Sequence, residues 1–215
     1  EAAMRMIEAT GDLNKNSDEI GRFNLKIGIG INTGDMIIGN IGSQDHFNYT
    51  VMGDEVNLAA RLEPLNKVYG TNILISKETY ELVADGFATR EIDECVVKGR
   101  QTTVKIYEIL DRGELQYELA EGMVQFEIGL DHYRNHRWQP ALEVFQQAKE
   151  CLGGDEASQL FIERCEQLLV TPTPENWDGY IRNDAVTSVT RGQHAGSSND
   201  NPLVGDVMQL GSLKL

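Results

Sequence analysis

The sequence predicts an α+β fold for the first half of the chain and a helical segment after it. Before residue 111, short strand-like runs alternate with amphipathic helical runs, and hairpins connect them instead of regular βαβ units. From Glu114 the pattern turns helical, until serine, asparagine, glycine and threonine dominate the end of the chain. We therefore expect an α+β part at 1–110, a helical extension at 111–178 and a flexible, low-complexity tail at 179–215.

Turn signals divide the beginning of the chain. Residues 1–10 are typical of the end of a helix, which Gly11 is expected to break. Residues 23–31 and 36–41 are predicted to be strands, and the turn signal between them predicts that they pair as a hairpin. A third short strand is expected at 47–52.

Capping signals place the next elements. Asp54 is predicted to cap a helix that begins at Glu55 and ends near Pro64. The remaining elements of this part are a strand at 72–75, a helix at 77–83 capped by Ser76, and strands at 87–97 and 103–110.

Helical periodicity predicts three helices in the second part. They are expected at 115–135, 138–152 and 156–169. The first two carry small and aromatic residues whose spacing resembles a tetratricopeptide repeat, namely Gly129, Tyr133, Ala141 and Phe145. Because one such unit is too short to form a solenoid, we expect it to pack on the first part or to bind a protein partner.

The charge balance excludes some classes of partner. The chain has 34 acidic and 19 basic residues and a net charge of −15, which argues against nucleic acid and anionic lipid as partners. No apolar run approaches the roughly 20 residues that cross a bilayer, so no membrane segment is predicted in this chain. Cys95, Cys151 and Cys165 lack the spacing of a metal site or a disulfide framework. We expect reduced thiols and a cytoplasmic location, with membrane attachment only through a preceding domain.

A glycine-rich run near residue 30 is similar to a dinucleotide-binding motif. The last spacing among Gly28, Gly30 and Gly34 is one residue too long, and a strand follows where a helix is required. The glycines are therefore expected to permit close backbone packing in the hairpin.

Two polar groupings have the chemistry to bind a nucleotide. Asn57 and Arg61 are four residues apart on a predicted helix, so they share one face. The guanidinium suits phosphate oxygens, and the amide suits a sugar. Lys98 and Arg100 flank Gly99 at a strand end, where they could hold a triphosphate. Each grouping alone is more typical of a solvated helix face or an ordinary basic hairpin.

Four segments in order resemble the C-terminal part of a class III nucleotidyl cyclase catalytic domain. Within residues 25–110 they are IGINTGDMIIGNIG, NYTVMGDEVNLAARLE, ILISKETYELV, and VVKGR ahead of a YEIL strand. The resemblance implies a partial α+β, ferredoxin-like cyclase fold. It also implies adenylate cyclase activity, in which the ribose 3′ oxygen of ATP attacks the α-phosphate, forming cyclic AMP and expelling pyrophosphate.

The same resemblance implies the catalytic and phosphate-binding residues. Asn57 matches the asparagine that positions the ribose, and Arg61 matches the arginine that stabilises charge developing on the α-phosphate. Lys98 matches the lysine that binds the terminal phosphates.

The purine-binding residues follow from the resemblance as well. Thr50 occupies the position that reads the purine, and threonine there is typical of the bacterial subclass that makes cyclic AMP and often responds to bicarbonate. Adenine is therefore favoured over guanine, with guanylate cyclase as the alternative. Val51, through its backbone, and Val56, through packing, would line the purine pocket.

Class III cyclases use two divalent ions, Mg²⁺ or Mn²⁺, held by two Asp residues. In the family those residues precede the matching segments, while Asp35, Asp45 and Asp54 fall at other positions. One domain supplies the metal-binding Asp residues and its partner supplies the residues named above. We therefore expect a homodimer, with the metal ligands outside this chain, and expect the chain alone to be inactive.

A second hypothesis is a non-catalytic cyclase homologue that acts as a regulatory or scaffold module through its helices. The helical extension resembles one that follows the cyclase domain in some bacterial adenylyl cyclases. His132 and His136 are four residues apart on a predicted helix, but no third ligand is evident, so a polar face is favoured over a metal site.

Overall fold

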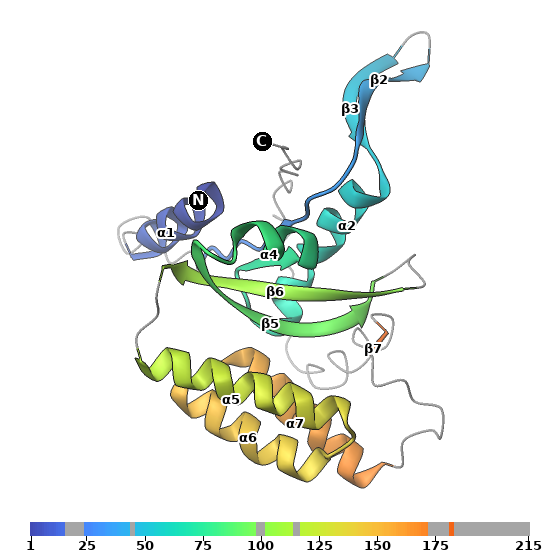
Figure 1. Ribbon diagram of the computed structural model, residues 1–215. Helices are drawn as coiled ribbons and strands as arrows, with labels where there is room; N and C mark the ends of the chain where they lie inside the picture. Colours follow the sequence, from blue (N-terminus) through green and yellow to red (C-terminus); the bar gives the residue numbers. More distant parts are fainter. Residues whose placement is uncertain (16–23, 44–45, 98–101, 114–116, 172–180, 183–215) are drawn as a thin grey trace, which may run out of the picture.

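A five-stranded mixed sheet lies between two layers of helices in the computed structural model (Figure 1). The structure describes residues 1–15, 24–43, 46–97, 102–113, 117–171 and 181–182. The sheet order is β1 (Ile29–Ile31), β4 (Ile73–Ser76), β6 (Thr103–Arg112), β5 (Phe87–Val96) and β7 (Ile181–Arg182). β1 runs parallel to β4, and β7 runs parallel to β5, whereas β6 is antiparallel to both its neighbours. The predicted α+β class is confirmed.

Alternating side chains divide the core between the two faces of the sheet. On one face, Ile73, Ile75 and Tyr107 pack with α1 (Ala2–Lys15) and α4 (Lys77–Val83). The opposite face is covered by the helices α2 (Asp54–Leu62), α3 (Leu65–Tyr69), α5 (Tyr117–Arg134), α6 (Trp138–Cys151) and α7 (Glu156–Val170). One continuous apolar cluster joins these five helices to the sheet, so the helical extension shares its core with the first part of the chain.

Local capping explains several boundaries. Ser76 Oγ accepts a hydrogen bond from the Thr79 N–H, as the sequence predicts for the start of α4. The predicted Asp54 cap is wrong, because α2 already begins at Asp54 and Gly53 occupies the cap position without a side-chain hydrogen bond. The Asp54 carboxylate instead lies in the first turn, where the helix dipole favours an anion. Gly11 does not break α1, which continues to Lys15.

The predicted hairpin between residues 23–31 and 36–41 is wrong. β2 (Ile37–Ser43) pairs with β3 (His46–Met52) in a separate antiparallel ribbon, which projects from the body of the protein (Figure 1). β1 instead joins β4, a strand about forty residues later in the sequence. Directly after β1, the buried side chain of Asn32 is hydrogen-bonded to Glu55 of α2 and not to the ribbon.

Helix α2 is fixed against β1 by close packing and hydrogen bonds. Asn32 Nδ2 donates to the main-chain oxygen of Glu55 at 3.0 Å and to its carboxylate at 2.7 Å. A Cβ at Gly30 would lie only 2.5 Å from the main-chain oxygen of Ala59 and from the Glu63 nitrogen, so only glycine fits without displacing α2. The glycines therefore permit close packing, as predicted, but against a helix and not within a hairpin.

The three predicted helices of the second part are confirmed as α5, α6 and α7. The four residues at repeat-like spacing, Gly129, Tyr133, Ala141 and Phe145, are all buried in the shared core. Membership of the tetratricopeptide family stays a prediction. Strand β7 falls within the segment predicted to be a flexible tail, while the rest of that tail lies outside the described residues. Among the described helices, none has the length and apolar character to cross a membrane.

The contact between α5 and α6 predicts opposite effects for two glycine-to-alanine changes. A Cβ at Gly129 would lie 2.7 Å from the Phe145 ring, whereas Gly11 on α1 has no neighbour within 4 Å of such a Cβ. We expect Gly129→Ala to lower the free energy of unfolding by about 1–3 kcal/mol through overpacking. Gly11→Ala should raise it by up to about 1 kcal/mol through helix propensity. Urea denaturation of both variants measures this, and equal effects would contradict the packing.

The Asn32 bond predicts a pH-dependent loss of stability in Asn32→Asp. The new carboxylate would be buried beside that of Glu55, so its folded-state pKa would be raised. Stability is then lost as the pH rises above the unfolded pKa, and we expect a deficit of about 2–4 kcal/mol at pH 7.5 that shrinks toward pH 5. Asn40→Asp, on the exposed ribbon, should change stability by at most about 0.5 kcal/mol. A deficit that does not change with pH would exclude this account.

Candidate functional site

Five of the six predicted site residues lie on β3 and α2, which adjoin one another in the chain. Gly53 alone separates the end of β3 at Met52 from the start of α2 at Asp54. Thr50 and Val51 are on the strand, and Val56, Asn57 and Arg61 are on the helix. Lys98, the sixth, lies outside the described residues, so its placement relative to the other five stays a prediction.

The orientation of α2 about its own axis places Asn57 and Arg61 on the side of the helix away from the core. Leu58 and Leu62 of the same helix are buried in the shared core and fix how the helix is turned. Asn57 is exposed and Arg61 is partly buried, one helical turn further on. The Asn57 N–H donates to the Gly53 oxygen at 3.1 Å, so this residue belongs to the first ordered turn.

Arg61 differs from the other arginines that are withdrawn from solvent. Arg90, Arg134 and Arg164 each bond to at least one carboxylate. Within the described part of the chain, the Arg61 guanidinium has neither an ion-pair partner nor a hydrogen-bond acceptor. A partly buried guanidinium that no carboxylate neutralises is suited to bind an anion such as a phosphate.

The ribbon sets the faces on which the purine-reading candidates lie. Thr50 pairs with Gly39 of β2 and is exposed, on the same face as Ile37 and Met52. Val51 pairs with Ile38 and points to the opposite face, so its side chain cannot share a pocket with that of Thr50 on the ribbon itself. This agrees with the expectation that Val51 contributes through its backbone.

Asn32 and Glu55 are positioning residues that the sequence interpretation missed. Asn32 belongs to the turn signal that follows residue 31, yet its side chain is buried and holds the first turn of α2 at Glu55, two residues before Asn57. Its Oδ1 atom is buried and has no hydrogen-bond partner among the described residues. No local pattern could have shown this, because Asn32 and Glu55 are 23 residues apart.

The described residues do not fit a two-metal site. Within the described ranges, no group of three or more His, Cys, Asp or Glu side chains lies close enough to hold a metal ion. Asp35 and Asp54 are exposed, and Asp45 lies outside these ranges. Of the two histidines four residues apart, His136 stacks its ring on that of Trp138, with the ring centres 5.2 Å apart.

The buried cysteines are not suited to nucleophilic chemistry. Burial raises the pKa of the Cys95 thiol to about 12, and burial likewise raises the pKa of Cys165 to about 12. Both thiols therefore stay protonated near neutral pH, whereas nucleophilic attack requires the thiolate. The two buried cysteines therefore add no nucleophile to the polar face of α2.

Comparison with known proteins connects this geometry to a family. Residues 1–111 match the family model described as the adenylate and guanylate cyclase catalytic domain. The terminal-differentiation-specific adenylate cyclase of Dictyostelium discoideum is 36% identical over 152 residues, which are 68% of this chain and 7% of that protein. Adenylate cyclase 1 of Rhizobium meliloti (strain 1021) is 41% identical over 81 residues, 38% of this chain and 12% of that protein.

Solved cyclase structures are also similar. The adenylyl cyclase CyaB from P. aeruginosa has 37% identity and a TM-score of 0.43, covering 54% of this chain and 58% of that one. The guanylyl cyclase Cya2 has 34% identity and a TM-score of 0.41, covering 53% and 56%.

The matches to the two curated relatives cover much more of this chain than of the relatives. This chain spans only 7% and 12% of the length of the two curated relatives. The Dictyostelium match covers 68% of this chain, more than residues 1–111 alone, so it extends into the helical extension. On the strength of the family match over residues 1–111, this chain belongs to the adenylate and guanylate cyclase catalytic-domain family.

Proposed function

We propose that this protein is an adenylate cyclase that converts ATP to 3′,5′-cyclic AMP and pyrophosphate in intracellular signal transduction. The observation that carries the proposal is Arg61, a partly buried cation without a described partner, one helical turn from the amide of Asn57. The curated relatives cited above, which are named adenylate cyclases, support the choice of ATP.

The two residues on α2 have complementary roles in the proposed reaction. The ribose 3′ hydroxyl loses its proton, its oxygen bonds to the α-phosphorus, and the bond from that phosphorus to pyrophosphate breaks. Asn57 would orient the ribose through its amide. Arg61 would stabilise the negative charge that develops on the α-phosphate oxygens, where a positioned cation acts mainly in the transition state. Lys98 would bind the terminal phosphates.

The purine would be read from the ribbon. Thr50 presents a hydroxyl that both donates and accepts hydrogen bonds on an exposed face. Val51 would line the purine pocket through its backbone, and Val56, which is partly buried, through packing. Guanylate cyclase remains the alternative for the same site, and a direct comparison of the two nucleotides decides between them.

The divalent ions of this reaction, two Mg²⁺ or Mn²⁺, are not assigned to any described residue. The family uses divalent metals, and we expect their carboxylate ligands in a segment outside the residues described above. The roles given to Asn57 and Arg61 do not depend on where those ligands lie.

A homodimer would complete the site and cover the ribbon. The ribbon exposes apolar side chains on both faces: Ile37 (69% exposed) and Met52 on one, Tyr49 (77% exposed) and Ile38 on the other. A two-stranded ribbon that projects alone is only marginally stable, and apolar patches of this kind mark interfaces. We therefore assign the ribbon as the contact with the second copy of the chain.

The decisive assay supplies ATP and GTP side by side, with Mn²⁺, to the enzyme together with its metal-binding segment. We expect cyclic AMP from ATP and at least tenfold less cyclic GMP. Equal or greater formation of cyclic GMP would support the guanylate alternative. No cyclic nucleotide from either substrate would support a non-catalytic regulatory or scaffold module.

Replacing Arg61 should affect turnover more than substrate affinity. In Arg61→Ala we expect kcat to fall about 100-fold or more while KM for ATP changes less than about fivefold, because the lost charge acts in the transition state. Steady-state kinetics of cyclic AMP formation measure both constants. Lys67→Ala, which removes an exposed cation from α3, is the matched control and should behave like the wild type. A large rise in KM with kcat intact would refute the role.

A charge on the ribbon should separate the dimer. We expect Tyr49→Lys, on the face opposite Thr50, to weaken association by at least tenfold, since it desolvates a charge at the interface. Leu82→Lys places the same charge on α4, at another exposed apolar side chain, and should leave the dimer intact. Sedimentation velocity over a concentration series measures the dissociation constant. Equal dimerisation of both variants would move the interface elsewhere.

A further inference from the structure

We propose that Arg164 of α7 is a positioning residue of the cyclase site, through which the helical extension holds α3 and β5, the elements that adjoin the site residues in the chain. The inference rests on the proposed function for its effect on turnover. The contacts of Arg164 that support it lie outside the site, where α7 packs against the sheet and α3.

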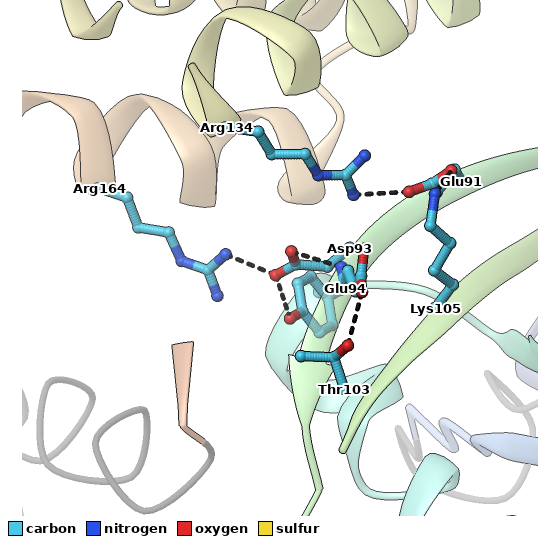
Figure 2. A network of polar contacts seen from close by, with 8 residues as sticks. Glu91, Asp93, Glu94, Thr103, Lys105, Arg134 and Arg164 are labelled. Atoms are coloured by element: carbon cyan, nitrogen blue, oxygen red, sulfur yellow. Dashed lines mark hydrogen bonds and ion pairs between the residues drawn. The ribbon is translucent and has the colours of Figure 1, made fainter. Parts of the chain in front are cut away.

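Arg164 joins three elements at one carboxylate. Its Nη1 donates to Asp93 Oδ2 of β5 at 2.9 Å, and the Tyr69 hydroxyl of α3 donates to the same oxygen at 2.7 Å. Figure 2 shows the Arg164 side chain extending from α7 to Asp93 at the sheet. The side chains of Arg164 and Asp93 are only 8% and 9% exposed, so water does not compete for these bonds.

The surroundings of Arg164 keep its guanidinium charged and hold it in place. Burial alone would lower the pKa of Arg164, but the neighbouring Tyr69 and Asp93 raise it above its usual value. The guanidinium also lies 4.7 Å from the centre of the Phe161 ring and 5.5 Å from that of Tyr69. Burial and Asp93 raise the pKa of Tyr69, so its hydroxyl stays protonated and donates. A buried ion pair adds little stability over an apolar pair of similar size, so we assign this pair a role in fixing the geometry of the elements it joins.

Both partners of Arg164 adjoin the elements of the site. Tyr69 ends α3, which begins at Leu65, three residues after the end of α2. Asp93 lies near the end of β5, where its neighbour Glu94 accepts a hydrogen bond from Thr103 of β6 at 2.6 Å. One side chain of the helical extension thus reaches both the helix that follows Asn57 and Arg61 and the strand that precedes Lys98.

A second buried contact prevents α7 from moving independently of the sheet. Arg90 of β5 donates to Glu108 at 2.9 Å and to Asp155 at the start of α7 at 3.0 Å. Burial would raise the pKa of the Asp155 carboxyl, but hydrogen bonds from Arg90 and Ser158 lower it, so it stays ionised at neutral pH. Since both the first turn and the middle of α7 are bonded to β5, a displacement of the helical extension would be transmitted to the sheet.

The test compares Arg164→Met, Arg164→Lys and Asp93→Asn with a surface control in the active dimer. The control is Arg137→Met, which removes another arginine of the helical extension whose ion pair with Asp131 is exposed. For each variant, kcat and KM for ATP are measured, together with amide hydrogen exchange across residues 54–69 and 87–97. Circular dichroism establishes that the helices are retained.

We expect Arg164→Met and Asp93→Asn to lower kcat at least tenfold and to accelerate exchange at least tenfold in both segments. Arg164→Lys should recover part of each loss, and Arg137→Met should match the wild type within twofold. A folded Arg164→Met protein with unchanged kcat, or with unchanged exchange in 54–69, would overturn the inference. If the wild type itself made no cyclic nucleotide, the proposed function would fail, while the exchange measurement would still support or overturn the coupling.

Discussion

Burial of the sheet face opposite α1 and α4 determines where most of the other helices lie. Strands β4 and β6 present apolar side chains on both faces of the sheet, and an exposed face would cost the free energy of its hydration. Helices α2 and α3 cover part of one face, and α5, α6 and α7 cover the remainder in a single apolar cluster. The change of composition near residue 111 therefore does not mark the edge of the core.

The same constraint orients the candidate site. Leu58 and Leu62 place one side of α2 in this core, and Gly30 allows the helix to approach β1 closely. The bond from Asn32 then fixes the first turn. The side of α2 that is not packed in this core carries Asn57 and Arg61. A nucleotide bound there would contact a cation whose position is set by helix packing and not by the conformation of a loop. This local cation reconciles a polyanionic substrate with a chain of net charge −15.

Local signals in the sequence predicted what depends on neighbouring residues. The cap at Ser76, the strands β5 and β6, and the three C-terminal helices each follow from patterns within their own segments of the sequence. The pairing of β1 could not be predicted in this way, because its partner is β4 and the turn signal after it suggested a hairpin. Arg164 and Asp93 are 71 residues apart, and neither looks unusual in its own segment. For the site, the resemblance indicated roles for Asn57 and Arg61 on α2. The hydrogen bonds by which Asn32 holds Glu55 could be seen only in the structure.

In the reaction proposed above, α2 presents Asn57 and Arg61 to the ribose and the α-phosphate of ATP. A crystal structure of the dimer with 3′-deoxy-ATP, which lacks the attacking hydroxyl, tests it most directly. We expect the Arg61 guanidinium within about 3 Å of an α-phosphate oxygen and the Asn57 amide within the same distance of a ribose oxygen. A nucleotide bound elsewhere, with both side chains facing solvent, would contradict it.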